Sequence, residues 1–377
     1  MSKVKLGEVA IEHKETCKGN KDGYPIVGLE HLVPEEVTLT AWDEGSDNTF
    51  TKMFRKGNVL FGRRRAYLKK AAVAPFDGIC SGDITVIEAI PDRILPMLLP
   101  FIIQNDELFD FAVGKSAGSL SPRVKWEHLK NYEFELPDMD KQRELAELLW
   151  AMDATKKSYH KLIAATDELV KSQFMEQFGS YLGDETRCAT VEQVCTVFAD
   201  GDWIESKDQA DDGIRLIQTG NVGNGVYLDK GERARYIDEE TFIRLNCTEV
   251  LPNDILISRL PDPVGRACII PDGLGKSITA VDCSIVRLKS HVLPEFFVAY
   301  TMTTLYAAQI GSSVTGSTRK RISRKNLGQV VIPTPDIDQQ EQFAAFVRQS
   351  DKSKFELEQA LSELTATYKR IITENLG

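Results

Sequence analysis

Two long segments of the chain alternate apolar and polar residues with the period of an α-helix. Residues 138–179 and 336–377 contain no proline, and their only glycines, Gly179 and Gly377, close them. Apolar residues recur in steps of three and four, or sums of these, which places them on one stripe of a helix. The residues of this predicted coiled-coil stripe are Leu145, Leu148, Met152, Tyr159, Leu162, Leu169, Phe174, Phe343, Phe346, Leu357, Leu361, Leu364, Tyr368 and Ile371.

Both predicted helices begin with the same local signal. Pro137 and Pro335 suit the turn before a helix, because proline lacks the N–H that a helix interior needs. An aspartate after the proline can accept hydrogen bonds from the free N–H groups of the first turn. The candidate capping residues are Asp138 or Asp140 in the first segment and Asp336 or Asp338 in the second.

The two helices belong to a longer internal repeat. Residues 118–179 align with residues 316–377 without a gap. Identical pairs include Gly118/Gly316, Arg123/Arg321, Gln142/Gln340 and Asp153/Asp351. Upstream, GNVLFGR at 57–63 matches NDILISR at 253–259, and SGDITVI at 81–87 matches AVDCSIV at 280–286. Such a repeat predicts the order domain, helix, domain, helix.

We therefore expect a first domain at 1–137, a first helix at 138–179, a second domain at 180–335 and a second helix at 336–377. Within the domains, β-branched runs predict strands, and longer apolar segments predict helices at the same relative place in each copy. The strand segments are 83–90 and 284–289, and the helical segments are 96–113 and 293–310. The predicted fold class is α/β.

A helix of about 38 residues is about 57 Å long, and one apolar stripe of that length needs a partner helix. The other copy is the nearest partner. Because only residues 180–184 follow the first helix before the second domain, we expect the two helices to pair as an antiparallel coiled coil with pseudo-twofold symmetry. The alternative is that each helix packs separately on its own domain.

Basic residues cluster although the net charge of the chain is −10. Residues 52–70 contain no acid, and residues 319–325 form a second cluster. Segregated Lys and Arg of this kind are typical of proteins that bind DNA phosphates, and the alternative is a solvated surface. The candidate DNA-binding residues of these clusters are Lys52, Arg55, Lys56, Arg63, Arg64, Arg65, Lys69, Lys70, Arg319, Lys320, Arg321, Arg324 and Lys325.

Further candidates come from the repeat and from one glycine-rich stretch. Arg123 is the counterpart of Arg321, and Arg259 is the counterpart of Arg63. In RLIQTGNVGNG, the side chains of Gln218, Thr219 and Asn221 have the chemistry that reads base edges. The alternative for this stretch is an ordinary turn.

The sequence contains no catalytic or metal-binding motif in its expected context. The seven cysteines contain no CxxC pair and are expected to be free thiols in a reducing cytosol, and the five histidines contain no HxH or HxxxH. GLGKS at 273–277 lacks the first glycine of a phosphate-binding loop, and GKSAG at 114–118 does not follow a strand. We expect neither a signal peptide nor a membrane span, and therefore a cytoplasmic protein.

With these features together, the chain resembles the specificity (S) subunit of type I restriction–modification systems. The resemblance covers essentially the whole chain and is carried by residues 59–87, 118–142 and 316–340. The turns before the helices read LPDMDKQ and TPDIDQQ, whereas this family often has Pro-Pro and Glu-Gln there, so that part of the match is incomplete.

The resemblance implies that each α/β domain is a target-recognition domain reading one half of a split sequence in double-stranded DNA. It also implies that the helices dock two DNA methyltransferase subunits, and with them the motor–nuclease subunits. The methyl donor and ATP then bind those partners, so this chain needs no cofactor and is not itself an enzyme. The alternatives are a subunit of a methyltransferase-only system, a non-catalytic coiled-coil scaffold, and an enzyme whose site escapes motif recognition.

Overall fold

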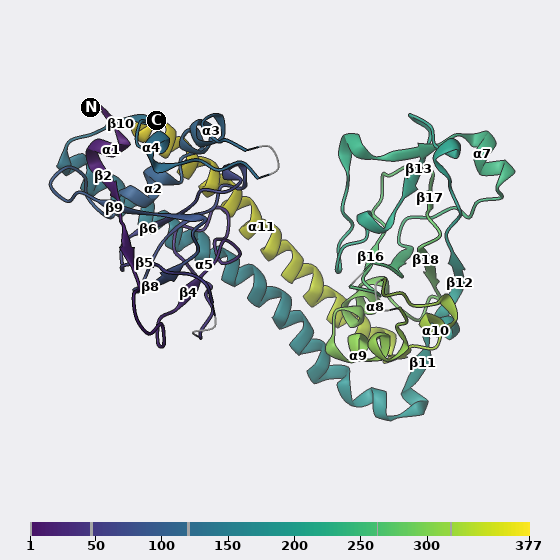
Figure 1. Ribbon diagram of the computed structural model, residues 1–377. Helices are drawn as coiled ribbons and strands as arrows, with labels where there is room; N and C mark the ends of the chain where they lie inside the picture. The colour runs from purple at the N-terminus through teal and green to yellow at the C-terminus, as the bar shows by residue number, and fades with distance from the viewer. Residues whose placement is uncertain (1, 46–47, 119–120, 262, 317–318) are drawn as a thin grey trace. The chain divides into compact units, whose positions relative to one another are not determined.

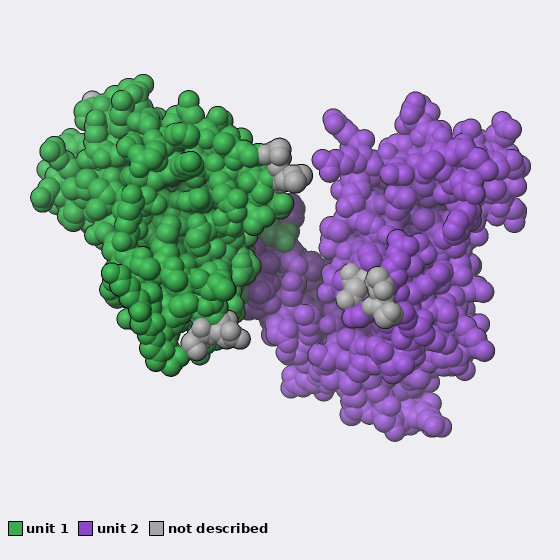
Figure 2. Space-filling view, in the orientation of Figure 1, with its two compact units in different colours: residues 1–161, 358–377 green, residues 162–357 purple. Residues whose placement is uncertain are grey.

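The computed structural model describes residues 2–45, 48–118, 121–261, 263–316 and 319–377 (Figure 1). The chain divides into two compact units, which Figure 2 colours separately. The first unit comprises residues 1–161 and 358–377, and the second comprises residues 162–357. Each unit therefore takes residues from both long helices.

The described residues of the first unit form three sheets and four short α-helices. A two-stranded antiparallel sheet joins β1 (Ser2–Lys5) and β10 (Glu133–Leu136). A four-stranded antiparallel sheet has the order β2 (Ala10–Glu12), β9 (Ile84–Ala89), β6 (Val59–Gly62), β7 (Ala71–Val73). The third sheet has the order β3 (Glu15–Thr16), β5 (Lys52–Phe54), β8 (Gly78–Cys80), β4 (Ile26–Val27). The short helices are α1 (Leu6–Val9), α2 (Leu99–Ile103), α3 (Asp106–Gly114) and α4 (Trp126–Leu129).

The second unit repeats this plan. Its two-stranded sheet joins β11 (Cys188–Thr190) and β19 (Val331–Pro333). Its four-stranded sheet has the order β12 (Cys195–Asp200), β18 (Cys283–Leu288), β15 (Ile255–Ser258), β16 (Ala267–Ile269). A three-stranded sheet has the order β14 (Arg235–Ile237), β13 (Ile214–Ile217), β17 (Ser277–Thr279). The short helices are α6 (Val191–Val194), α7 (Glu239–Arg244), α8 (Pro294–Thr301), α9 (Thr304–Ser313) and α10 (Arg324–Gly328).

The apolar segments 96–113 and 293–310 each form two short helices instead of one continuous helix. Asn105 has extended backbone angles between α2 and α3, and its side chain accepts a hydrogen bond from the N–H of Glu107. Thr303 does the same between α8 and α9, with its hydroxyl accepting from the N–H of Tyr306. In both copies a polar residue caps a new helix inside an apolar run, which divides the run.

The long helices are α5 (Met139–Phe178) and α11 (Ile337–Leu376), each of 40 residues. The carboxylate of Asp138 accepts from the N–H of Lys141 at 3.0 Å, so Asp138 caps α5. Helix α11 begins directly after Asp336. Caps of this kind satisfy N–H groups that have no partner within the helix.

In the first unit, the start of α5 lies antiparallel to the end of α11. The Lys156 ammonium lies 4.8 Å from the centre of the Tyr368 ring. The carbonyl of Gly377 accepts from the N–H of Glu135, just before α5 begins. Tyr368, Ile372 and Leu376 of α11 are buried in the same core as α2, α3 and the first turns of α5.

In the second unit, the end of α5 lies antiparallel to the start of α11. The ring centres of Phe174 and Phe343 are 5.4 Å apart. Further along, the Lys354 ammonium lies 2.8 Å from the Asp167 carboxylate. The fold class expected from the sequence is therefore confirmed: two α/β domains are each followed by a long helix, and the helices pair antiparallel.

Candidate DNA interface

In the first unit, arginines from two distant segments meet at one aspartate. Arg63 and Arg64 follow β6, and Arg123 precedes α4. The N–H of Arg63 donates to the carbonyl of Asp83 at 3.0 Å. Arg123 Nε donates to the carboxylate of Asp83 at 2.7 Å, and Arg64 Nη1 lies 3.4 Å from the same carboxylate while Arg64 Nε donates to Ser121.

The Asp83 carboxylate keeps a charge that orients these arginines. The hydrogen bond from Arg123 holds the pKa of Asp83 below its usual value, so Asp83 is ionised at neutral pH. One carboxylate faces two guanidinium groups, and the exposed Arg65 lies next in the chain. The cluster is therefore held in place and still carries a net positive charge.

The second unit repeats the backbone arrangement of this cluster. Arg259 follows β15, and its N–H donates to the carbonyl of Asp282 at 2.9 Å. The carbonyl of Arg259 accepts from Ile322, as that of Arg63 accepts from Val124. Arg321 lies 3.9 Å from the Asp282 carboxylate. The same three segments thus meet in both domains.

The two copies differ in the exposure of the first arginine. Arg259 is only 3% exposed, and its guanidinium donates to the carbonyl of Val281 and lies 3.3 Å from Asp200. Arg324 reaches the same carboxylate at 3.7 Å and donates to the carbonyl of Phe198. Arg259 is thus placed to position its neighbours, while Arg321 and Arg324 have exposed side chains.

The remaining basic residues of 52–70 do not all lie at the arginine cluster. Arg55 binds the carboxylates of Glu15 and Asp77. Lys52 and Lys70 donate to the carbonyls of Ile84 and Leu29, and Lys69 lies 2.6 Å from Asp106. Lys56 is exposed. The sheet places these residues at separate points, so the run of basic residues is not one continuous patch.

In the second basic cluster, Arg319, Lys320 and Lys325 are exposed. Residues 317–318, directly before them, lie outside the described part of the chain. The backbone N–H and carbonyl of Arg321 pair with the carbonyl and N–H of Thr315.

The start of the glycine-rich stretch, residues 218–221, lines a groove in the second unit. Gln218 and Thr219 are half-buried on its wall, whereas Asn221 is 6% exposed and bonds the N–H of Gln218 and the carbonyl of Leu228. The side chain of Asn221 therefore fixes the loop. Arg266, which the sequence did not single out, also holds this loop by donating to the carbonyls of Thr219 and Val222.

The repeated glutamine after each helix-starting turn proves to be a buried clamp. Gln142 accepts from the N–H of Leu95 and donates to the carbonyl of Pro137. Gln340 accepts from Leu293 and donates to the carbonyls of Pro335 and His291. Both side chains are at most 2% exposed. The sequence shows that the glutamine is repeated, but it does not reveal that the side chain joins each long helix to its domain.

The predicted helix stripe is buried at some positions and exposed at others. Leu145, Met152, Phe174, Phe343 and Tyr368 are buried, but Leu148, Leu162 and Leu169 are about half exposed. Tyr159, Phe346, Leu357, Leu361, Leu364 and Ile371 are intermediate. At four places the buried residue is the next one in the chain: Leu149, Val170, Val347 and Ile372.

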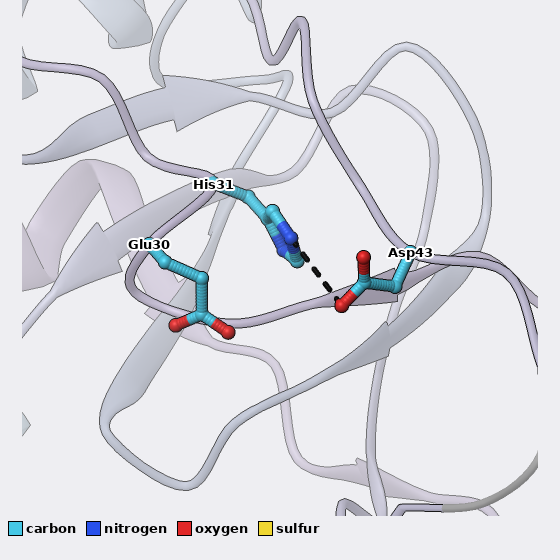
Figure 3. Close-up of side chains that lie close together, drawn as sticks. All are labelled: Glu30, His31 and Asp43. Carbon is cyan, nitrogen blue, oxygen red and sulfur yellow. Dashed lines mark ion pairs between the residues drawn. The ribbon is translucent and has the colours of Figure 1, made fainter. Parts of the chain in front are cut away.

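Among the described residues, one group could hold a metal ion: Glu30, His31 and Asp43 (Figure 3). His31 Nδ1 accepts from the N–H of Gly28 at 3.0 Å, and Nε2 lies 3.5 Å from Asp43. With Nδ1 unprotonated, the neutral ring carries its proton on Nε2, facing the carboxylate. A metal on Nε2 would need the opposite tautomer, so these side chains fit a hydrogen-bonded loop better than a metal centre.

The side chains of the two incomplete motifs, GLGKS at 273–277 and GKSAG at 114–118, make local structural contacts. Lys276 of GLGKS precedes β17, pairs with Glu239 and lies over the ring of Phe242. Ser116 of GKSAG follows α3 and donates to the carbonyl of Ala112. In the described part of the chain, no helix is long and apolar enough to cross a membrane.

Comparison with known proteins agrees with this arrangement. The specificity subunit of the type I restriction enzyme EcoDI of Escherichia coli is 25% identical over 183 residues, which are 48% of this chain and 37% of that subunit. The putative type I restriction enzyme MjaX specificity subunit of Methanocaldococcus jannaschii is 19% identical over 391 aligned positions, covering 94% of this chain and 88% of that protein.

Solved structures show the same fold. A chain from a study of complex assembly and conformational transition in a type I restriction–modification system matches with a TM-score of 0.60 and 20% identity, over 99% of this chain and 97% of that one. The S subunit from M. genitalium matches with a TM-score of 0.54 and 11% identity, over 100% and 96%. The family described as "Type I restriction modification DNA specificity domain" matches residues 1–165 and 186–365, and the chain belongs to this family.

Proposed function

We propose that the chain directs a type I restriction–modification complex to a bipartite target in double-stranded DNA, with residues 1–137 reading one half-site and residues 180–335 the other. The observation that carries this proposal is the repeated arginine cluster. In the first domain the backbone of Arg63, after β6, bonds to Asp83 and to Val124, the residue that follows Arg123. In the second domain the backbone of Arg259, after β15, bonds in the same way to Asp282 and to Ile322, the residue that follows Arg321. Two copies of a cationic surface on two copies of one domain suit two half-sites.

We further propose that the helical segments 138–179 and 336–377 dock two methyltransferase subunits, and through them the motor–nuclease subunits. Support comes from apolar side chains that the helix pair leaves exposed. Leu148, Leu162 and Leu169 of α5 and Phe355 of α11 are between 45% and 58% exposed. Several exposed apolar residues on the same helices favour a protein partner.

In this proposal the reaction chemistry belongs to the partners. The chain supplies DNA recognition and positions the target, and the methyl donor and ATP bind the other subunits. Methylation or cleavage of DNA by the isolated chain would contradict this division of roles.

The test is selection of bound sites from a random duplex library by the full chain together with its methyltransferase subunits. We expect two short half-sites separated by unread base pairs, because two separate domains each contact one segment of the duplex. Their centres should lie near one helical turn apart, where both face the same side of the DNA. One continuous recognition site, or full binding to a single half-site, would overturn the proposal.

A further inference from the structure

A groove of about 300 Å³ opens in the second unit, on the three-stranded sheet. One side is the turn that contains Gln218 and Thr219. The other side is the segment from Lys230 to Arg235, which leads into β14. Because β13 and β14 are paired antiparallel, these two segments lie together although the sequence separates them.

The groove has an excess of positive charge. Arg215 at its base is neutralised by Asp229, whose pKa the N–H of Gly231 and the Arg215 charge hold below its usual value. Within the described ranges, the side chain of Arg235 donates only to the neutral amide of Gln209. Lys230 and Arg233 are exposed, and no ion pair or side-chain hydrogen bond engages them within the described residues. Among the described residues, Lys230, Arg233 and Arg235 line the groove without an ion pair to a carboxylate, and the exposed Glu232 lies between Lys230 and Arg233 in the chain but is not part of the groove lining.

The turn that faces these cations is firmly held. Arg266 donates to the carbonyls of Thr219 and Val222 at 2.9 and 2.7 Å, and to those of Pro261 and Pro263. Asn221 closes the turn from inside through its two hydrogen bonds. A turn fixed on one side by a guanidinium group keeps its groove-facing side chains in place before any ligand arrives, which lowers the entropic cost of binding.

We propose that this groove contributes to DNA reading by the second domain, in addition to the arginine cluster that contains Arg321; the inference rests on the proposed function. Lys230, Arg233 and Arg235 contact backbone phosphates, and Gln218 with Thr219 faces the base edges. Cations release counterions from the phosphates and give affinity. A glutamine amide both donates and accepts, which suits the edge of adenine in the major groove.

Affinity is tested with the full chain and a fluorescent mixed-sequence duplex of about 40 base pairs. The variant is Lys230→Gln with Arg233→Gln, both at exposed positions, so the fold should be kept. Losing two phosphate contacts should lower the slope of log affinity against log salt by about two. The affinity gap to the unaltered chain should then shrink about tenfold between about 50 and 200 mM KCl.

The matched control is Lys171→Gln with Lys352→Gln, which removes the same charge from α5 and α11 within the same unit. We expect the control to keep the slope of the unaltered chain. A groove variant that behaves like the control overturns the inference.

Base reading is tested separately with Gln218→Ala in the site selection described above. We expect the preference to relax at one position of one half-site, while Arg233→Gln weakens binding without changing the selected sequence. An unchanged selected sequence for Gln218→Ala overturns the reading role.

The two levels of the proposal fail differently. If the unaltered chain shows no salt-dependent binding to the duplex, alone or with its methyltransferase subunits, both the proposed function and the groove are wrong. If the unaltered chain binds and the groove variant binds equally well, only the groove assignment falls. Salt-sensitive binding of an acidic peptide in place of DNA would also overturn the groove assignment.

Discussion

Gln340 satisfies three backbone groups of the second domain from the first turn of α11. Its Oε1 accepts from Leu293 at 2.9 Å, and its Nε2 donates to Pro335 at 2.8 Å and His291 at 2.9 Å. The side chain is fully buried, so water cannot replace it. A buried polar group that loses its partner costs about 1–3 kcal/mol, which makes this residue a strong structural requirement.

We expect Gln340→Leu to lower the free energy of unfolding of the second unit by at least about 2 kcal/mol, because it leaves buried polar groups unpaired. Urea unfolding measures the change. Gln349→Leu on the exposed side of the same helix is the control and should change stability by less than about 0.5 kcal/mol. Equal effects of the two substitutions would show that the clamp does not stabilise the helix start.

Arg123 and Arg321 are equivalent residues of the two proposed half-site readers. Arg123→Gln should lower the salt slope by about one and weaken recognition of one half-site, and Arg321→Gln should do the same for the other. Each variant controls for the other, since the change in charge is identical. Selection of bound sites distinguishes the two, and a loss in the same half-site for both would contradict the assignment of one half-site to each domain.

At the scale of the elements, adjacent apolar pairs decide how each long helix is buried. Successive residues of a helix point about 100° apart, so either member of a pair such as Leu148–Leu149 or Leu169–Val170 extends an apolar stripe. In both pairs the structure buries the second member. The first members remain exposed and are available to a partner.

Phe174 and Leu169 test this orientation on one helix. Phe174 is fully buried against Phe296 and Phe343, whereas Leu169 is 51% exposed. Phe174→Ala should destabilise the second unit by about 3–5 kcal/mol through the cavity it leaves. Leu169→Ala should stay within about 0.5 kcal/mol. Chemical denaturation compares the two, and a larger effect at Leu169 would mean that the opposite face of α5 is buried.

At the scale of the whole molecule, the first unit is not continuous in sequence, and both units contain residues of both long helices. The last residues of α11 complete the first unit, and the last residues of α5 complete the second. The core of the first unit therefore contains residues of both long helices: Tyr368, Ile372 and Leu376 of α11 pack with Leu149 of α5 and with Phe101 in one cluster. Each domain depends on the helix that follows the other domain.

Deletion of residues 358–377 should therefore unfold the first unit rather than the second. It removes Tyr368, Ile372 and Leu376 from the core, at roughly 2–5 kcal/mol each, which is comparable with the whole stability of a domain. Hydrogen exchange should show lost protection in α2 and α3 and retained protection in β15 and β18. Retained protection in α2 and α3 would contradict this dependence.

If the helix pair sets the spacing of the two half-sites, lengthening both helices should lengthen the spacer and leave the half-sites unchanged. Four residues inserted after Ala164 and after Ser362 add about 6 Å, nearly two base pairs at 3.4 Å each. We expect selected targets with a spacer longer by about one or two base pairs. Insertion into one helix alone should lower stability, because it shifts one stripe against the other. An unchanged spacer in the double insertion would refute this role of the helices.

The sequence alone determined the features that depend on local or repeated signals. The proline–aspartate starts and about 40 residues of helical period located α5 and α11, and the repeat gave two domains of one plan. Tertiary structure decided what depends on contacts between distant segments. It determined which member of each apolar pair is buried, and which basic residues of 52–70 form ion pairs with carboxylates of the same domain. It also brought Lys230 and Arg233 opposite Gln218, because strand pairing, which local sequence does not encode, joins those segments.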